Sequence, residues 1–161
     1  MILHAGLIAC WSGGSWRGAL IEGPSGAGKS DLALRCLEAG FRLVADDRTI
    51  IWSSEGRVYG RAPETLFGLI EARGVGVLPE PALAYCEVVL VAVCGPAERL
   101  PEPQTVVRGG GRLPLVAVSP LEPSAPAKLR RAIEHLGAGA KTAYLARRSA
   151  SPWPSTTGDS R

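Results

Sequence analysis

At 161 residues, the chain is long enough for one domain with a substantial core and too short for two comfortable ones. Its composition of 46% hydrophobic and 20% charged residues is ordinary for a globular α/β protein, and no apolar run reaches the roughly 18 residues of a membrane span. The formal net charge is +3, and Arg147, Arg148 and Arg161 against Asp159 place two of these charges in the tail. The rest of the chain is nearly neutral, which argues against a nucleic-acid surface.

The N-terminus and the cysteines indicate the cellular compartment in which the protein is expected. Residues 1–4 have no basic region ahead of an apolar core and are not a secretory signal, so we expect a cytoplasmic protein with no membrane partner. Cys10, Cys36, Cys86 and Cys94 lie in apolar sequence without CxxC spacing. This pattern favours buried thiols over a zinc site or a disulfide framework.

The chain begins with a hairpin that leads into a glycine-rich loop. Residues 2–11 alternate loosely and predict a strand, residues 12–15 a turn, and residues 16–21 a second strand with a buried end. The eight residues from position 23 then fit the motif G-x-x-x-x-G-K-[ST] at every fixed position. They are Gly23, Pro24, Ser25, Gly26, Ala27, Gly28, Lys29 and Ser30.

A helix is predicted directly after this loop. Asp31–Ala39 places Leu34 and Leu37 on one apolar stripe, and Gly40 supplies a stop. Strand, glycine loop and helix in this order are the setting that the motif requires. The alternative, a glycine-rich turn that fits the motif by chance, explains neither the strand nor the helix.

The motif predicts a phosphate-binding loop. Its glycines let backbone N–H groups turn inward around phosphate oxygens, and the helix N-terminus adds its partial positive charge. In such loops the lysine, here Lys29, reaches the β- and γ-phosphates of a nucleotide. The hydroxyl of the next residue, Ser30, is offered to magnesium.

Two acidic residues follow the next predicted strand. Residues 41–45 form a buried run that ends at Asp46 and Asp47. If this strand runs parallel to the one before the loop, the carboxyl ends of both lie at the edge of the sheet where ligands bind. One carboxylate would hold or orient magnesium and the other would accept the proton of an attacking hydroxyl. The competing interpretation is a solvated strand end with an Asx turn.

The remaining elements complete an α/β fold. We expect one domain over residues 1–145 and a disordered tail over 146–161, where Ser, Thr, Pro and Gly dominate. The predicted elements are a hairpin of Thr49–Trp52 and Arg57–Tyr59, a central strand at Glu87–Val93, strands at Thr105–Val107 and Leu113–Val118, and a helix at Ala125–Leu136 with Ser124 as its N-cap.

Four further residues have side chains suited to phosphoryl chemistry. Glu71 and Arg73 lie in a glycine-rich stretch and provide an acid and a charge clamp, although an exposed strand edge has the same composition. His4 and Arg99 carry no signal from spacing alone. A lone histidine is usually structural, and a loop arginine is usually solvated.

Three motifs together resemble a known family. The glycine loop at 23–30, Leu43-Val44-Ala45-Asp46-Asp47 and Glu71-Ala72-Arg73-Gly74-Val75-Gly76 are similar, in order and separation, to the C-terminal catalytic domain of HPr kinase/phosphorylase. The resemblance covers roughly residues 2–136. It implies a P-loop kinase domain with a central mixed β-sheet, a helix after the phosphate loop and a C-terminal helix. It also implies transfer of phosphate from ATP to a serine of HPr, the phosphocarrier protein of the sugar phosphotransferase system, in the regulation of carbohydrate metabolism.

The resemblance also implies roles by position. His4 corresponds to the family's active-site histidine, and Arg99 to its arginine after the central strand. Lys29 would bind the nucleotide phosphates, and Ser30 and Glu71, with Asp47, would bind magnesium. Asp46 is favoured as the base, although adjacent carboxylates exchange such roles and the sequence does not separate them. Residues 71–77, which include Arg73, would contribute to catalysis and partner contact as a unit.

The chain departs from the family pattern at two places. The long members have an N-terminal domain, whereas this chain starts almost at the first strand, as the short forms do; a homo-oligomer is allowed but not required. The family's basic loop near the C-terminus, associated with phosphorolysis of phospho-HPr, is replaced by Leu113–Pro120. We therefore expect the forward kinase reaction.

Two other functions compete with an HPr kinase. The same loop and aspartate would serve a phosphotransferase acting on a small hydroxyl compound. The third hypothesis is a switch that binds ATP or GTP without turnover, and an aspartate close to the γ-phosphate argues against it.

Overall fold

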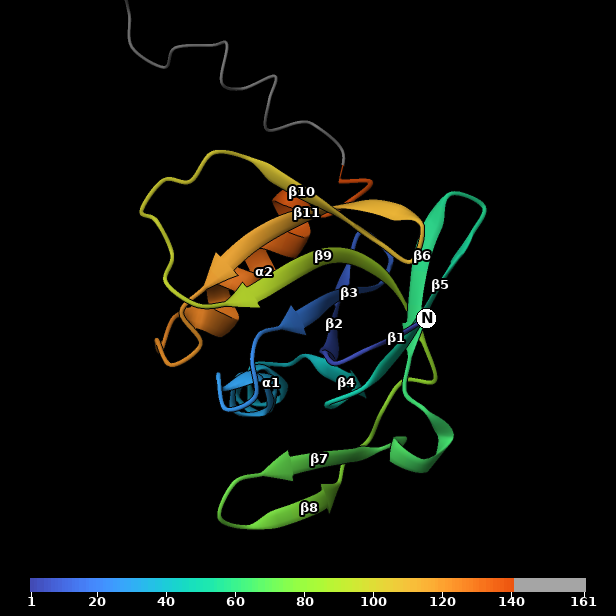
Figure 1. Cartoon of the computed structure of the whole chain (residues 1–161), viewed down its shortest axis with the longest axis vertical. Coiled ribbons are helices and arrows are strands. Elements are labelled where there is room, and N and C mark those ends of the chain that lie inside the picture. The colour runs from blue at the N-terminus through green and yellow to red at the C-terminus, as the bar shows by residue number, and fades with distance from the viewer. Residues whose placement is uncertain (141–161) are drawn as a thin grey trace, which may run out of the picture.

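A nine-stranded mixed sheet organises the computed structural model, which describes residues 1–140 (Figure 1). The strands of its main path lie in the order β1-β5-β6-β9-β3-β2-β4, and the hairpin β10–β11 joins it at β9. A separate two-stranded ribbon, β7–β8, projects from the body. The mixed α/β fold predicted from the sequence is confirmed, including the central sheet and both helices. The elements are β1 (Ile2–Leu3), β2 (Gly6–Ser12), β3 (Ser15–Glu22), α1 (Lys29–Glu38), β4 (Arg42–Ala45), β5 (Thr49–Ser54), β6 (Arg57–Arg61), β7 (Leu69–Ala72), β8 (Gly76–Pro79), β9 (Cys86–Cys94), β10 (Gln104–Arg108), β11 (Gly111–Val118) and α2 (Ala125–Leu136), with a short 3-10 turn at Glu64–Leu66.

Strand direction brings four loops to one edge of this sheet. Strand β9 is parallel to β3, and β11 is parallel to β9. Both β3 and β4 are antiparallel to β2, so β4 also runs in the direction of β3. The carboxyl ends of β3, β4, β9 and β11 therefore meet at one edge, which we call the carboxyl edge. The predicted parallel relation between β3 and β4 is correct, with β2 between them.

The first predicted strand is interrupted. Residues 2–11 form two strands, because β1 pairs with β5 whereas β2 pairs with β3 and β4. The break falls at His4 and Ala5, and the buried Thr49 hydroxyl donates a hydrogen bond of 2.8 Å to the Ala5 carbonyl. The break matters because it removes His4 from both ladders. The predicted turn at 12–15 is confirmed by the pairing of Ser12 with Ser15.

The two helices cover one face of the sheet, and they differ from the sequence predictions in detail. Helix α1 buries Leu32, Ala33 and Cys36, whereas the predicted stripe residues Leu34 and Leu37 are only partly buried. Apolar periodicity identified the helix but not the side that faces the sheet. Gly40 ends the helix as predicted, with a φ of 93°.

Helix α2 has the predicted bounds but not the predicted cap. Ser124 is the N-cap residue, yet its backbone is already helical (φ −81°, ψ −4°) and its side chain makes no capping hydrogen bond. A preceding turn, in which the Ala125 N–H donates to the Glu122 carbonyl, starts the helix instead. Between residues 1 and 140, no helix is long and apolar enough to cross a membrane. The predicted boundary at 145 and the tail lie outside the described residues.

Candidate active site

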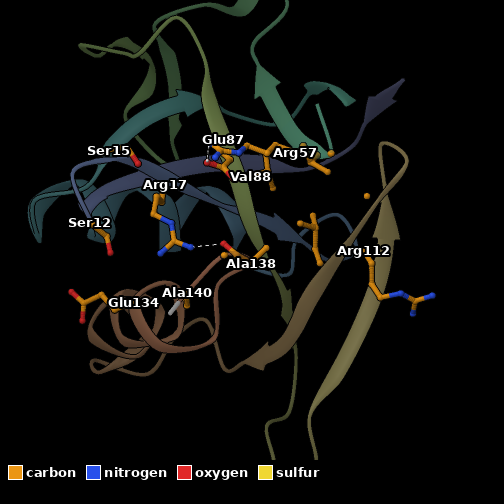
Figure 2. Close-up of a pocket in the computed structure, with 16 residues that line it drawn as sticks. Ser12, Ser15, Arg17, Arg57, Glu87, Val88, Arg112, Glu134, Ala138 and Ala140 are labelled. Carbon is orange, nitrogen blue, oxygen red and sulfur yellow. Dashed lines mark hydrogen bonds and ion pairs between the residues drawn. The ribbon is translucent and has the colours of Figure 1, made fainter. Parts of the chain in front are cut away.

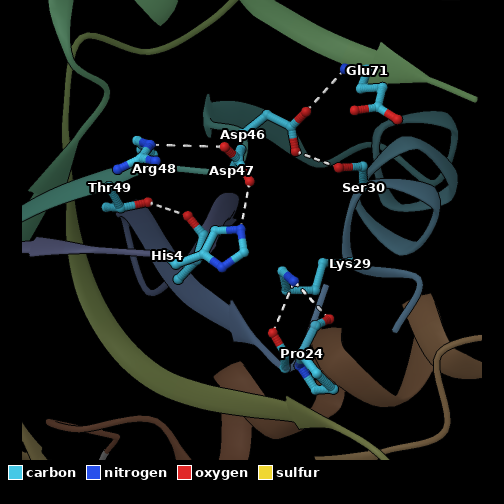
Figure 3. Close-up of polar contacts among 11 residues, drawn as sticks. His4, Pro24, Lys29, Ser30, Asp46, Asp47, Arg48, Thr49 and Glu71 are labelled. Atoms are coloured by element: carbon cyan, nitrogen blue, oxygen red, sulfur yellow. Dashed lines mark hydrogen bonds and ion pairs between the residues drawn. The ribbon is translucent and has the colours of Figure 1, made fainter. Parts of the chain in front are cut away.

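The glycine loop connects β3 to α1 and closes around its own lysine. The Lys29 ammonium donates hydrogen bonds to the carbonyls of Gly23 (2.8 Å) and Pro24 (3.0 Å), and the residue is only 9% exposed (Figure 3). Gly23, Gly26 and Gly28 all have positive φ values, of 154°, 80° and 98°. The loop thus holds a nearly buried cation that has no carboxylate partner in the described part of the chain, which is an arrangement suited to an anionic ligand.

Glycine is required at the start of the loop by space as well as by conformation. A Cβ atom on Gly23 would lie 3.1 Å from the Cβ of Cys94 and 3.3 Å from that of Ala27. Cys94 ends β9, so the loop rests on the neighbouring parallel strand. This contact couples the position of the loop to the core of the sheet.

Asp46 is held firmly at both carboxylate oxygens. The Ser30 hydroxyl donates to Oδ1 at 2.8 Å, and the Glu71 backbone N–H donates to Oδ2 at 2.9 Å. Asp46 is 7% exposed. Asp46 therefore links three elements (Figure 3). It follows β4, accepts a hydrogen bond from the first turn of α1 and accepts another from a backbone N–H of β7.

Asp47 points to a different partner. Its Oδ1 lies 2.6 Å from Nε2 of His4, and both side chains are about half exposed, at 56% and 51%. The backbone of Asp47 has a φ of 65°, in the left-handed region, and Arg48 lies 3.9 Å from its other carboxylate oxygen. Because the chain turns at Asp47, two adjacent carboxylates serve two separate contacts.

The other predicted site residues lie farther out. Glu71 contacts Asp46 through its backbone only, and its side chain is exposed on β7. Arg73 is exposed in the turn between β7 and β8, and Arg99 is exposed in the loop between β9 and β10. Within residues 1–140, the side chains of these three residues make no hydrogen bond or ion pair. The structure thus brings together His4, Lys29, Ser30 and the aspartates, and does not bring Arg73 or Arg99 to them.

The donor set agrees with magnesium carried on a nucleotide. No group of three or more His, Cys, Asp or Glu side chains gathers as a metal site in the described part of the chain. Magnesium in kinases needs only one or two protein ligands, because phosphates and water complete its coordination. Ser30 and Asp46 provide a hydroxyl and a carboxylate in contact with each other at the loop.

One ion pair beside the loop was not predicted from the sequence. Arg108 of β10 donates to both carboxylate oxygens of Glu22, each at 2.8 Å, and Glu22 is the last residue of β3 before Gly23. The hydrogen bonds to the Glu22 carboxylate raise the pKa of Arg108. The pair fixes the strand end from which the loop departs. Nothing local in the sequence links these residues, which are 86 positions apart.

A hollow lies at the opposite edge of the sheet. It measures about 680 Å³ and is lined by the 12–15 turn, the first residues of β9 and β11, and the end of α2. Figure 2 shows Arg17 reaching from β3 to the carbonyl of Ala138, and Arg17 also donates to the Ile133 carbonyl. Arg57 lies 3.8 Å from Glu87. These cations are engaged within the protein, and none of the predicted site residues lines the hollow.

The four cysteines are free and buried, as predicted. Burial raises the pKa of the Cys36 thiol to about 12, and it also raises those of Cys10, Cys86 and Cys94. Protonated thiols are poor nucleophiles. We therefore assign them to the core and not to the chemistry.

Comparisons with known proteins agree on one family. The family model described as "HPr Serine kinase C-terminal domain" matches residues 3–83, half of the chain. HPr kinase/phosphorylase of Clostridium perfringens is 47% identical over 66 residues, and that of Streptococcus thermophilus is 48% identical over 62. These matches span 41% and 38% of this chain, and only 22% and 20% of the relatives.

A solved structure has the same fold. The Hpr(Ser) kinase/phosphatase from Coxiella burnetii superposes with a TM-score of 0.69, over 83% of this chain and 93% of that one. Its sequence is 22% identical. The structural likeness therefore extends well beyond the segment matched by sequence.

Proposed function

Because the chain belongs to the HPr serine kinase C-terminal domain family, we propose that it transfers phosphate from ATP to a serine of HPr. HPr is the phosphocarrier protein of the sugar phosphotransferase system, so the reaction would regulate carbohydrate metabolism in the cytoplasm. The observation that carries the proposal is the division of the adjacent aspartates between the loop serine and His4. One carboxylate near the loop serine suits a nucleotide-binding loop, and a second, half-exposed carboxylate beside it is placed to accept a proton from an acceptor hydroxyl.

Asp47 is better suited than Asp46 to accept the proton of the acceptor. Both oxygens of Asp46 already receive hydrogen bonds and the residue is buried, whereas Asp47 is half exposed and reachable by a hydroxyl from another protein. This assignment exchanges the roles favoured from the sequence. His4 would orient the Asp47 carboxylate and share the proton that it accepts.

The remaining residues supply charge and position. The loop N–H groups and Lys29 would bind the phosphates, and Ser30 and Asp46 would hold magnesium directly or through water, with Glu71 as a further ligand. Magnesium, when bound with the nucleotide, neutralises charge on the phosphate oxygens. Asp47 would take the serine proton as the serine oxygen bonds to the γ-phosphorus, and ADP would leave with the bridging oxygen. Arg73 and Arg99 are exposed and unpaired in the described structure, and would stabilise the transferred group from flanking loops.

The decisive experiment uses labelled ATP, magnesium and purified HPr. We expect label on a serine of HPr, identified by mass spectrometry, and little release from phospho-HPr on addition of inorganic phosphate. Label on a small alcohol in place of HPr would support a small-molecule phosphotransferase. Binding of ATP without single-turnover transfer to either acceptor would support a nucleotide switch, and both outcomes would contradict the proposal.

A further inference from the structure

The segment 119–123, between β11 and α2, packs against the phosphate loop. A Cβ atom on Gly28 would lie 3.5 Å from the Pro120 side chain and 3.7 Å from Cδ2 of Leu121. These distances are ordinary van der Waals contacts, so both side chains lie directly beside the loop at Gly28. Leu121 is nevertheless 75% exposed. A large apolar side chain is thus presented to solvent at the rim of the candidate nucleotide site.

The segment is held in place by α1. Arg35 donates hydrogen bonds to the carbonyls of Pro120 and Glu122, the latter at 3.1 Å, and it pairs with Asp31 at 3.1 Å. The Glu122 carboxylate is itself paired with Lys128 of α2 at 2.6 Å. The exposed position of Leu121 is therefore set by a network that links the segment to both helices, and it is not the consequence of an unrestrained loop.

The segment lies on the side of the loop away from the aspartates. Asp46 and Asp47 follow β4, whereas the segment follows β11, and strands β2, β3 and β9 lie between β4 and β11. Figure 1 shows the β11–α2 connection on one side of α1, with β4 and β7 on the other. With the reacting end of a triphosphate at Asp47, as proposed, the direction away from Asp47 across the start of α1 leads to the segment beside Gly28.

We propose that Pro120 and Leu121 form the surface on which the purine base of the nucleotide packs. The proposal rests on ATP as the phosphate donor, and it adds the part of the site that the loop motif does not describe. Contact with a planar base would cover the exposed Leu121 side chain, which removes apolar area from water. Neither side chain has a hydrogen-bond donor or acceptor, so this surface supplies affinity but little discrimination between adenine and guanine.

The test compares a ligand with a base to one without. Calorimetry with the full chain gives the Kd of MgATP and of magnesium tripolyphosphate for the wild type and for Leu121→Ala. We expect MgATP to bind the variant about 3- to 10-fold more weakly, because the apolar contact between the Leu121 side chain and the base is lost. The Kd for tripolyphosphate should not change. Leu121→Trp should bind MgATP more tightly than the wild type, because a larger ring stacks on the base. Leu136→Ala, at the far end of α2 and 52% exposed, is the matched control and should change neither Kd.

Each alternative result has a definite meaning. An unchanged MgATP affinity in Leu121→Ala would overturn the proposal, and so would an equal loss for both ligands, which would show that Leu121 acts only through the shape of the loop. A wild-type chain that binds neither ligand would contradict the proposed function as well, whereas one that binds both equally would refute the base surface alone.

Discussion

The carboxyl edge of the sheet and the opposite, amino edge both carry charged residues, but they use them differently. At the amino edge, Arg17 donates to backbone carbonyls and Arg57 faces Glu87, around the hollow of about 680 Å³. At the carboxyl edge, Lys29 is nearly buried, and among residues 1–140 its hydrogen-bond partners are carbonyls of its own loop. Since Arg17 also has backbone carbonyls as its partners, the site for an anion is marked by the setting of Lys29, a nearly buried cation in a glycine loop with positive φ values, and not by the size of a hollow.

The strongest test of this comparison is removal of the cation at the carboxyl edge. Lys29→Ala should nearly abolish transfer from ATP, with a loss of at least about 10²-fold, because the charge that faces the phosphates disappears while the loop backbone remains. Circular dichroism should show a folded protein. Transfer at the wild-type rate in a kinase assay would show that the site has been placed at the wrong loop.

The two aspartates make the comparison sharper within the carboxyl edge. Asp47→Asn should slow the transfer step by about 10²–10⁴-fold in single-turnover experiments and leave MgATP binding intact, because a positioned base is lost. Asp46→Asn should chiefly raise the magnesium concentration needed for activity, because a charge beside Ser30 is lost.

The reverse pattern for the two variants would restore Asp46 as the base. If neither variant slows transfer to HPr and both are folded, the mechanism is wrong. Titration of magnesium in parallel assays separates these cases.

The buried thiols should affect the pH dependence of stability in the same way at both edges of the sheet. Cys86 and Cys94 are buried at the two ends of β9. Burial raises their pKa values in the folded state above the usual value of about 9, so the folded protein retains these protons after the unfolded chain has lost them. Stability from this source is complete below pH 9 and is lost as the pH rises toward 12, the value for Cys36. The loss is up to about 1.4 kcal/mol per pH unit for each thiol. Urea unfolding between pH 8 and 10.5 should show the decline, and Cys36→Ala should make it less steep.

The smallest effect is expected at the amino edge. Arg57→Ala removes an exposed pair with a separation of 3.8 Å, so the free energy of unfolding should change by less than about 1 kcal/mol and transfer should not change. Thermal unfolding and the kinase assay measure the two quantities. A large loss of transfer in this variant would mean that the hollow takes part in the reaction.

The elements with local signals were predictable from the sequence. The glycine loop, the turn at 12–15 and helix α2 each follow from short-range patterns, and all lie at the predicted residues, although α2 lacks the predicted capping hydrogen bond. The break at His4 was not predictable, because it depends on a hydrogen bond from Thr49, 44 positions away. The separate contacts of Asp46 and Asp47 follow from the left-handed backbone of Asp47, which no pattern of residue types reveals.

The left-handed backbone at Asp47 has a consequence for sequence change at this position. Glycine, asparagine and aspartate adopt this conformation with the least strain, and aspartate alone among them is charged. If Asp47 is the base, as proposed, a copy of this domain that no longer needs the reaction could replace Asp47 by asparagine or glycine and keep the turn. Under this proposal, the residue at position 47 would distinguish relatives that transfer phosphate from relatives that have lost transfer.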